Sequence, residues 1–237
     1  MLWIALVPAI ALRADFARDV ARIHTEATGG REQIDALKSF KATGVTRNER
    51  GEMPFIMWAA RPSSIRIEVK MNAQTITQGW DGEQNPWTTD PRTKRVIFLS
   101  GQAAEDFKAE AEFDDPLLAG PDRKVTTDYV GVVEEDGTKY IKIMVTQNFT
   151  AVSFVYLDAA TYLIVRRDVV RRRGVTEMVL RTDYSDFREV AGVVLPHRMI
   201  VTAGGKRVRE TVIDVMQANP QVAEGFFAAR VSALASP

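Results

Sequence analysis

Cysteine is absent from this 237-residue chain, and histidine occurs only as His24 and His197. The lack of cysteine excludes disulfides, thiolate metal sites, a cysteine nucleophile and the acceptor of a bacterial lipid anchor. Two histidines are too few to favour a histidine metal site or a catalytic triad, and we interpret both as surface residues. The sequence therefore predicts a protein that uses no metal and no other cofactor.

An excess of charge of either sign is also missing. Lys and Arg together number 31, as do Asp and Glu, so net charge does not predict a nucleic-acid partner. The acidic groups Asp114-Asp115 and Glu134-Glu135-Asp136 fall in loop and hairpin contexts, where solvated turns are expected and catalysis is not. We therefore expect a protein that is not an enzyme, and an envelope hydrolase is the alternative with least support.

The apolar run at the N-terminus, Leu2 to Leu12, is too short to span a bilayer. The run ends in small residues, with Ala9-Ile10-Ala11 in the A-x-A form and a cut after Ala14 as a second choice. We expect residues 1–14 to be a signal peptide and the protein to be a soluble periplasmic one. The alternative is an apolar helix that packs onto the fold.

The spacing of apolar residues changes along the chain from a helical repeat to the two-residue repeat of strands. Residues 15–38 have a helical stripe of Phe16, Val20, Ile23 and Ala27, and Gly29-Gly30 predicts its end. Period two follows from Phe40 to Trp87, a second helix is predicted over 100–113, and strands then continue with a hairpin at Asp136-Gly137. No linker rich in Pro, Gly or Ser divides the chain, so we expect one mainly β, antiparallel domain over 15–237.

The stretch "FIMWAARPSSIRIEVKM", residues 55–71, is apolar to an unusual degree. Its second half alternates strictly, as in a strand with one buried face, whereas its first half has large apolar groups on both faces. Seven side chains of this stretch are candidates to line a ligand cavity, although packing in an ordinary core explains each of them as well. They are Phe55, Met57, Trp58, Ile65, Ile67, Val69 and Met71.

Three stretches resemble the LolA-like periplasmic lipoprotein carriers and the broader group of outer-membrane lipoprotein-sorting-like proteins. "AARPSSIRIEV" is similar to the Arg-Pro turn of that group, and "QGWDGEQNPWTTDP" is similar to its Asp-Gly hairpin. "YLDAATYLIVRRDV" with "DYSDFREVAGVVLPHRM" resembles the C-terminal half of the broader group.

The resemblance implies an incompletely closed antiparallel β-barrel with a few lid helices over an apolar cavity. It implies that the cavity holds lipid acyl chains or a lipoprotein, with a membrane-bound donor or acceptor protein as partner. It also implies that Arg61 latches the lid. The alternative, which the neighbouring residues suggest by themselves, is that Arg61 is an ordinary arginine exposed in a turn. We expect a monomeric carrier of a lipidic group. The alternative is a sensing module of the same fold that binds a lipid or lipoprotein without carrying it.

A burial argument supports a carrier independently of the resemblance. Exposing an acyl chain to water costs about 0.8 kcal/mol per CH₂, so a chain of ~14 carbons costs roughly 11 kcal/mol. A protein that moves such a chain needs an apolar cavity that opens for cargo and closes when empty.

Five arginines, Arg166, Arg167, Arg171, Arg172 and Arg173, form a basic cluster in the sequence. Two interpretations are open. The cluster is a solvated strand face that protects an edge, or it is a docking patch for an acidic membrane partner or anionic lipid head groups.

Overall fold

The computed structural model describes residues 9–118, 125–147, 151–173 and 176–229. Three helices are present in these ranges: α1 (Ala9–Ala27), α2 (Arg31–Ala36) and α3 (Gly101–Glu110). The strands are β1 (Ser39–Asn48), β2 (Gly51–Ala60), β3 (Ser64–Met71), β4 (Gln74–Trp80), β5 (Trp87–Thr89), β6 (Val96–Phe98), β7 (Val125–Glu135), β8 (Thr138–Gln147), β9 (Ala151–Asp158), β10 (Ile164–Arg173), β11 (Thr176–Val190), β12 (Val193–Ala203) and β13 (Lys206–Ala218).

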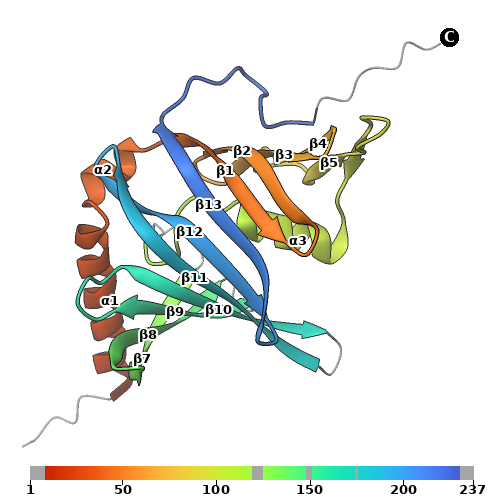
Figure 1. The fold of residues 1–237 in the computed structure, drawn as a ribbon. Helices are drawn as coiled ribbons and strands as arrows, with labels where there is room; N and C mark the ends of the chain where they lie inside the picture. Colours follow the sequence, from red (N-terminus) through yellow and green to blue (C-terminus); the bar gives the residue numbers. More distant parts are fainter. Residues whose placement is uncertain (1–8, 119–124, 148–150, 174–175, 230–237) are drawn as a thin grey trace, which may run out of the picture. The chain divides into compact units, whose positions relative to one another are not determined.

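The strands form one sheet in the order β6-β5-β4-β3-β2-β1-β13-β12-β11-β10-β9-β8-β7 (Figure 1). Strands β6 and β7 are its two edges, so the sheet is not closed. Neighbouring strands pair antiparallel in registers such as Phe55 with Val69 and Arg167 with Thr182. The predicted mainly antiparallel, incompletely closed sheet with a few helices is confirmed.

The chain forms two compact units. The first comprises residues 1–34 and 115–210, and the second comprises residues 35–114 and 211–237. One domain over residues 15–237 stays a prediction. Residues 1–8 of the predicted signal peptide lie outside the described residues, and α1 begins within the rest of it, at Ala9. Among the described helices, none has the length and apolar character that crossing a bilayer requires.

Two tight turns join neighbouring strands, and the first lies where the sequence predicts it. Asp136 and Gly137 join β7 to β8 with φ values of 50° and 77°, and Gly204 and Gly205 join β12 to β13 with 55° and 79°. Both turns need two residues with positive φ, which glycine and aspartate tolerate better than most residues.

The core of the first unit lies between α1 and strands β8 and β9. Ala17 and Val20 of α1 pack against a fully buried group of aliphatic side chains, namely Ile141, Ile143, Val145, Val155 and Leu157. The predicted stripe is partly wrong, because Phe16 is 46% exposed and contacts Tyr129 at its edge. Small Ala17 faces the sheet instead, which lets the helix approach closely.

Both histidines are buried, so their interpretation as surface residues is wrong. His24 follows Ala17 and Val20 on the packed face of α1, and His197 lies on β12, each with 3% of its surface exposed. Nδ1 of His197 lies 3.0 Å from the carbonyl oxygen of Leu195. A histidine can be buried where its ring nitrogens find partners, and those partners decide its position.

Candidate functional site

The apolar face of β2 and β3 lies in the second unit. The antiparallel register opposes Phe55 to Val69, Met57 to Ile67 and Ala59 to Ile65, so these side chains share one face. Helix α3 lies on that face, where Phe107 and Ala111 pack with Ile65 and with four partly buried side chains. Those four are Met57, Ile67, Trp80 and Leu99.

The cover that α3 provides is thin. Within the helix only Ala104 and Phe107 are buried, whereas Ala103, which the sequence pattern also predicts on this side, is exposed. Phe55 and Ile65 are buried at 6% and 4% exposure, whereas Val69 and Met71 keep part of their surface accessible. Their role as cavity lining stays a prediction, and six of the seven candidates alternate along one sheet face.

Trp58 is the exception, because it lies on the opposite face of β2. It pairs with Arg66 across β3, and its ring meets that of Phe226 at 5.2 Å between centroids. Arg66 places its guanidinium 5.0 Å from the Phe226 ring and donates from Nη1 to the Phe226 carbonyl oxygen at 3.3 Å. The C-terminal segment, the described residues after β13, therefore covers Trp58 through Phe226. This cover explains why β2 is apolar on both sides.

Trp87 extends this second face. Its ring lies against Gly79, where a Cβ would come within 2.6 Å of a ring atom, and its Nε1 donates to the Phe227 carbonyl oxygen at 3.0 Å. A hollow of about 440 Å³ beside the segment is lined by Ser64, Asp81, Glu83 and residues 223–228. Its lining combines acidic side chains with the apolar residues of 223–228, so it differs in character from the predicted apolar cavity.

Arg61 lies in the turn between β2 and β3, and it contacts residues that follow α2 and residues that follow α3. Its Nε donates to the carbonyl oxygen of Leu37, just after α2, at 2.8 Å. Its Nη1 is ion-paired with the Asp114 carboxylate, and its guanidinium lies 4.7 Å from the ring of Phe113, both after α3. The Arg61 side chain is 20% exposed and the Asp114 side chain 16% exposed.

Sequence reasoning missed Leu37, Phe113 and Asp114. Asp114 was expected in a solvated turn, but it is largely buried against Arg61. The backbone N–H of Phe113 also donates to the Pro62 carbonyl oxygen, at 3.3 Å. An acid and an aromatic residue directly after a weakly apolar helix were the only signal in the sequence.

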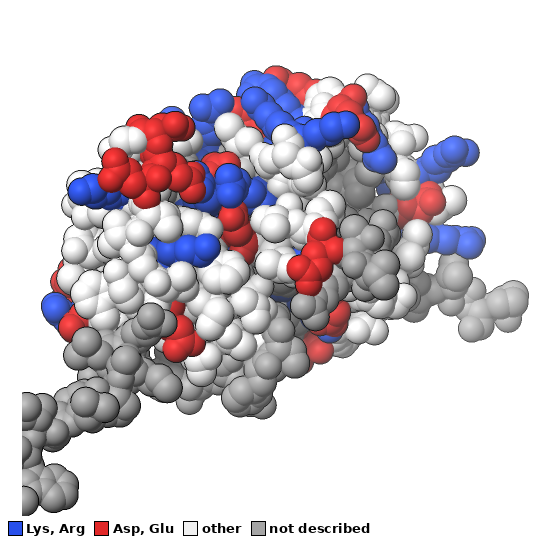
Figure 2. Space-filling model, turned by 90° about the horizontal axis from the view of Figure 1, so that it is seen from below, with Lys and Arg blue, Asp and Glu red and all other residues white. Residues whose placement is uncertain are grey.

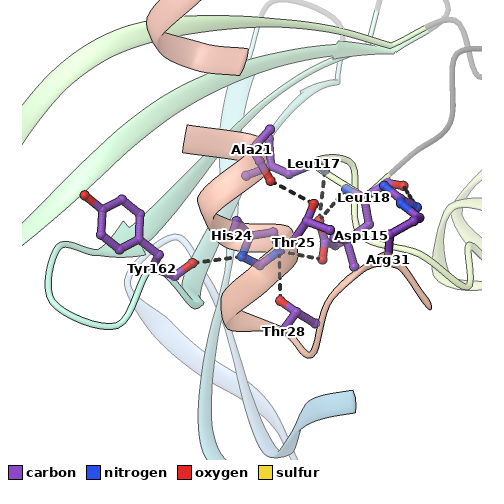
Figure 3. A network of polar contacts seen from close by, with 9 residues as sticks. All are labelled: Ala21, His24, Thr25, Thr28, Arg31, Asp115, Leu117, Leu118 and Tyr162. Carbon is purple, nitrogen blue, oxygen red and sulfur yellow. Dashed lines mark hydrogen bonds and ion pairs between the residues drawn. The ribbon is translucent and has the colours of Figure 1, made fainter. Parts of the chain in front are cut away.

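The first unit contains a second buried polar group, around His24 (Figure 3). Nδ1 of His24 lies 2.8 Å from the Tyr162 carbonyl oxygen, and Nε2 lies 3.1 Å from Oδ2 of Asp115. Asp115 also accepts from the backbone N–H groups of Leu117 and Leu118 at 2.9 and 3.3 Å. Asp115 thus ties its loop to α1, although part of its side chain stays exposed.

Both ring nitrogens of His24 face oxygens that accept hydrogen bonds, so the geometry favours the doubly protonated ring. Burial lowers the pKa of His24, but the charge of Asp115 and the hydrogen bonds to Asp115 and Tyr162 raise it more, so it lies above 6.5. Burial raises the pKa of Asp115, yet the His24 charge and the loop N–H groups bring it below its usual value.

The basic cluster is not one patch. Strand alternation places Arg166 and Arg167 on opposite faces of β10. Arg166 is ion-paired with Glu135 at 2.9 Å and with Asp183 at 3.2 Å. The side chains of Arg172 and Arg173 lie outside the described residues. Figure 2 shows that basic and acidic side chains lie beside one another on one face of the molecule.

Within the part of the chain that the structure describes, no group of three or more His, Asp or Glu side chains is arranged to hold a metal ion. The buried polar groups described above make hydrogen bonds and ion pairs with one another. They provide positioning contacts between helices, loops and sheet.

No protein-family model matches the chain. A search of the curated proteins finds no match either. Solved structures do match. A protein described as an outer membrane lipoprotein-sorting domain, from Vibrio parahaemolyticus, has a TM-score of 0.63 at 12% identity and covers 91% of this chain and 97% of its own. A DUF1329 family protein from Desulfovibrio piger has a TM-score of 0.63 at 11% identity, with the same coverage.

A LolA superfamily protein from Nitrosomonas europaea has a TM-score of 0.59 at 14% identity and covers 90% of this chain and 97% of its own. At such identities the likeness concerns the fold. The chain has the LolA-like fold, as the three sequence stretches predicted.

Proposed function

We propose that this protein binds a lipidic group in the cell envelope and carries it, without catalysing a reaction, on the apolar face that α3 covers. The observation that carries this proposal is the thin cover of that face. The helix places one large side chain, Phe107, on a sheet that presents Met57, Ile67 and Trp80 only partly buried. Apolar surface of this kind is stabilised when an acyl chain replaces water on it.

The fold supports the same proposal by analogy. Structures described as a lipoprotein-sorting domain and as a LolA superfamily protein share the open antiparallel sheet. Acyl chains of a lipoprotein are therefore the first cargo to test, and membrane-bound donor and acceptor proteins are the partners that a carrier needs. A periplasmic location and residues 1–14 as signal peptide are part of the proposal.

Arg61 is the latch in this proposal. It joins the end of β2 to the exits of α2 and α3 through one carbonyl oxygen, one carboxylate and one aromatic ring. Charge-assisted hydrogen bonds contribute about 1.5–3 kcal/mol each before exposure is discounted. That range is enough to favour α3 in place on the sheet, and burial of an acyl chain of ~14 carbons exceeds it.

The test uses the absence of cysteine from the natural chain. Ile67→Cys places one thiol on the α3 face, and Glu68→Cys places one on the opposite face of the same strand. We expect bound lipoprotein or acyl lipid to slow maleimide modification of Ile67→Cys severalfold and to leave Glu68→Cys unchanged. Equal protection of both thiols, or of neither, would contradict the proposed face.

Native mass spectrometry of protein purified from its own envelope identifies the ligand class. A co-purifying lipid or lipoprotein supports the proposal. Transfer of that ligand to acceptor membranes separates a carrier from a sensing module of the same fold, which would bind without transfer.

A further inference from the structure

The first unit holds a cationic side chain on its helix-covered face. Arg167 of β10 opposes Val155 of β9 and Thr182 of β11, and Val155 belongs to the core under α1. Among the described residues, Arg167 makes one side-chain hydrogen bond, from Nη2 to Oε1 of Gln147 at 3.1 Å, and no ion pair. Its neighbours Arg166 and Arg181 each have a carboxylate partner.

Two buried polar atoms on this face have no hydrogen-bond partner. They are Nε of Arg167 and Oγ of Ser153, and within the described residues they are the only buried side-chain nitrogen or oxygen atoms in this state. Ser153 opposes Val145 on one side and Val169 on the other, so it lies diagonally from Arg167 on the same face. Ser153 is 3% exposed.

Such a pair of atoms calls for an explanation. Most buried polar groups in proteins are hydrogen-bonded, and an unpaired one destabilises the fold. Here a guanidinium N–H and a hydroxyl lie near one another, and Gln147 already contacts the same arginine. These groups are the donors that an anion with two or more oxygens accepts from.

The surroundings suit an amphiphile better than a free inorganic ion. Aliphatic side chains of the same face flank the polar group: Val145 and Val155 are fully buried in the core under α1, and Val169 is partly exposed. Tyr184 adds a polar hydroxyl nearby. Its removal from water raises its pKa, while the positive charge of Arg167 lowers it in part, so the hydroxyl keeps its proton at neutral pH.

We propose that Arg167, Ser153 and Gln147 bind the anionic head group, a carboxylate or a phosphate, of an amphiphile whose chain lies on the partly exposed part of this sheet face, beside Val169 and outside the core that α1 covers. This inference rests on the proposed binding of lipidic groups and adds a site in the first unit, separate from the face that α3 covers, with a preference for acidic head groups. The guanidinium provides the charge, and the serine hydroxyl donates to a second oxygen of the head group.

The experiment compares three ligands with one chain length: tetradecanoate, tetradecanol and a monoacyl glycerophosphate with a tetradecanoyl chain. Binding to the full chain is measured by calorimetry. We expect the wild-type protein to bind at least one of the two acids about tenfold more tightly than the alcohol. Arg167→Met should remove that preference and leave alcohol binding unchanged, and Ser153→Ala should reduce it severalfold.

Arg166→Met is the matched control, because Arg166 is the adjacent arginine on the opposite face. It should keep the preference for the acid. The acid that shows the Arg167-dependent preference identifies the source of the head group, a fatty acid or a phospholipid.

The outcomes separate this inference from the proposed function. Equal binding of acids and alcohol by the wild-type protein overturns the head-group site and leaves lipid binding standing. Binding of no ligand by the wild-type protein contradicts the proposed function itself. Without ligand, Arg167→Met should unfold close to the wild-type temperature, since it removes an unpaired N–H together with the hydrogen bond to Gln147. A clearly lower temperature would show a structural arginine and overturn the site.

Discussion

Oδ2 of Asp115 lies 3.1 Å from Nε2 of His24, and the residues are 91 positions apart in the chain. The His24 side chain is 3% exposed and that of Asp115 is 32% exposed. The contact ties the loop after α3 to α1 within the first unit. It makes the stability of that unit depend on pH.

The directions of the two pKa shifts predict how the stability that the pair contributes changes with pH. The folded-state pKa of His24 is raised, so its contribution is fully present below its unfolded value of about 6.5 and is lost as pH rises through the folded value. The pKa of Asp115 is lowered, so its contribution is present above about 3.8 and is lost as pH falls through the folded value. The pair therefore stabilises most between about pH 4 and 6.5.

Urea unfolding of the wild type and of His24→Gln from pH 5 to 9 tests this prediction. We expect the wild type to lose its advantage above pH 6.5, by about 1.4 kcal/mol for each pH unit up to the folded pKa. His197→Gln is the control, because His197 is equally buried but contacts only a carbonyl oxygen among its described partners. A constant difference between wild type and His24→Gln across this range would refute the charged pair.

Arg61→Leu should leave the fold intact and shift α3 towards release. It removes the bonds to the Leu37 carbonyl oxygen and to Asp114, so we expect a loss of about 1–3 kcal/mol in the free energy of unfolding. Cargo should bind more tightly and pass poorly to acceptor membranes. Transfer assays and thermal unfolding measure the two effects.

Arg61→Lys should show part of the effect of Arg61→Leu, because an ammonium group does not reproduce the planar guanidinium that contacts Leu37 and Asp114 together. Asp114→Asn is the matched partner variant. Normal cargo transfer by Arg61→Leu would leave Arg61 as a structural turn residue.

Helix α3 should exchange its amide hydrogens faster than β2 and β3. It buries only Ala104 and Phe107 within its length, whereas each of those strands is paired on both sides. Phe107→Ala should speed exchange in α3 further, and the exposed-side variant Lys108→Ala should have little effect. Protection in α3 equal to that in β2 would identify a structural helix.

Phe226→Ala should release the C-terminal segment from the second face of the sheet. The variant loses ring contacts with Trp58, Arg66 and Phe227, for which we expect about 1–2 kcal/mol in the free energy of unfolding. Tryptophan fluorescence should shift to longer wavelength as Trp58 gains water. Val222→Ala, an exposed position in the same segment, is the control. An unchanged spectrum would show that Phe226 does not shield Trp58.

Features that depend on neighbours in the chain were predictable from the sequence. The alternation of Ile65, Ile67 and Val69 predicted strand β3, and Asp136-Gly137 predicted the hairpin between β7 and β8. The apolar spacing of Ala103, Ala104, Phe107 and Ala111 predicted the packed side of α3 except at Ala103, which is exposed. Backbone geometry alone relates such residues, because side chains repeat every two positions in a strand and every 3.6 in a helix.

What covers each face was decided only by the tertiary structure. Alternation implies that Trp58 and Met57 point to opposite sides of β2, but not that Phe226 packs on one and α3 on the other. Alternation likewise implies that Arg166 and Arg167 point to opposite sides of β10. It does not imply that Arg166 pairs with carboxylates or that Arg167 lies on the side of the core.

The histidines show the physical reason most plainly. Residue type places His24 at the surface, because an imidazole is costly to bury without partners. Its partners, Asp115 and the Tyr162 carbonyl oxygen, lie 91 and 138 positions away. By itself the sequence determined the strands, the turns and the open LolA-like sheet, through local periodicity and family-like stretches. Burial of polar side chains was determined by tertiary contacts, because partners distant in sequence make that burial favourable.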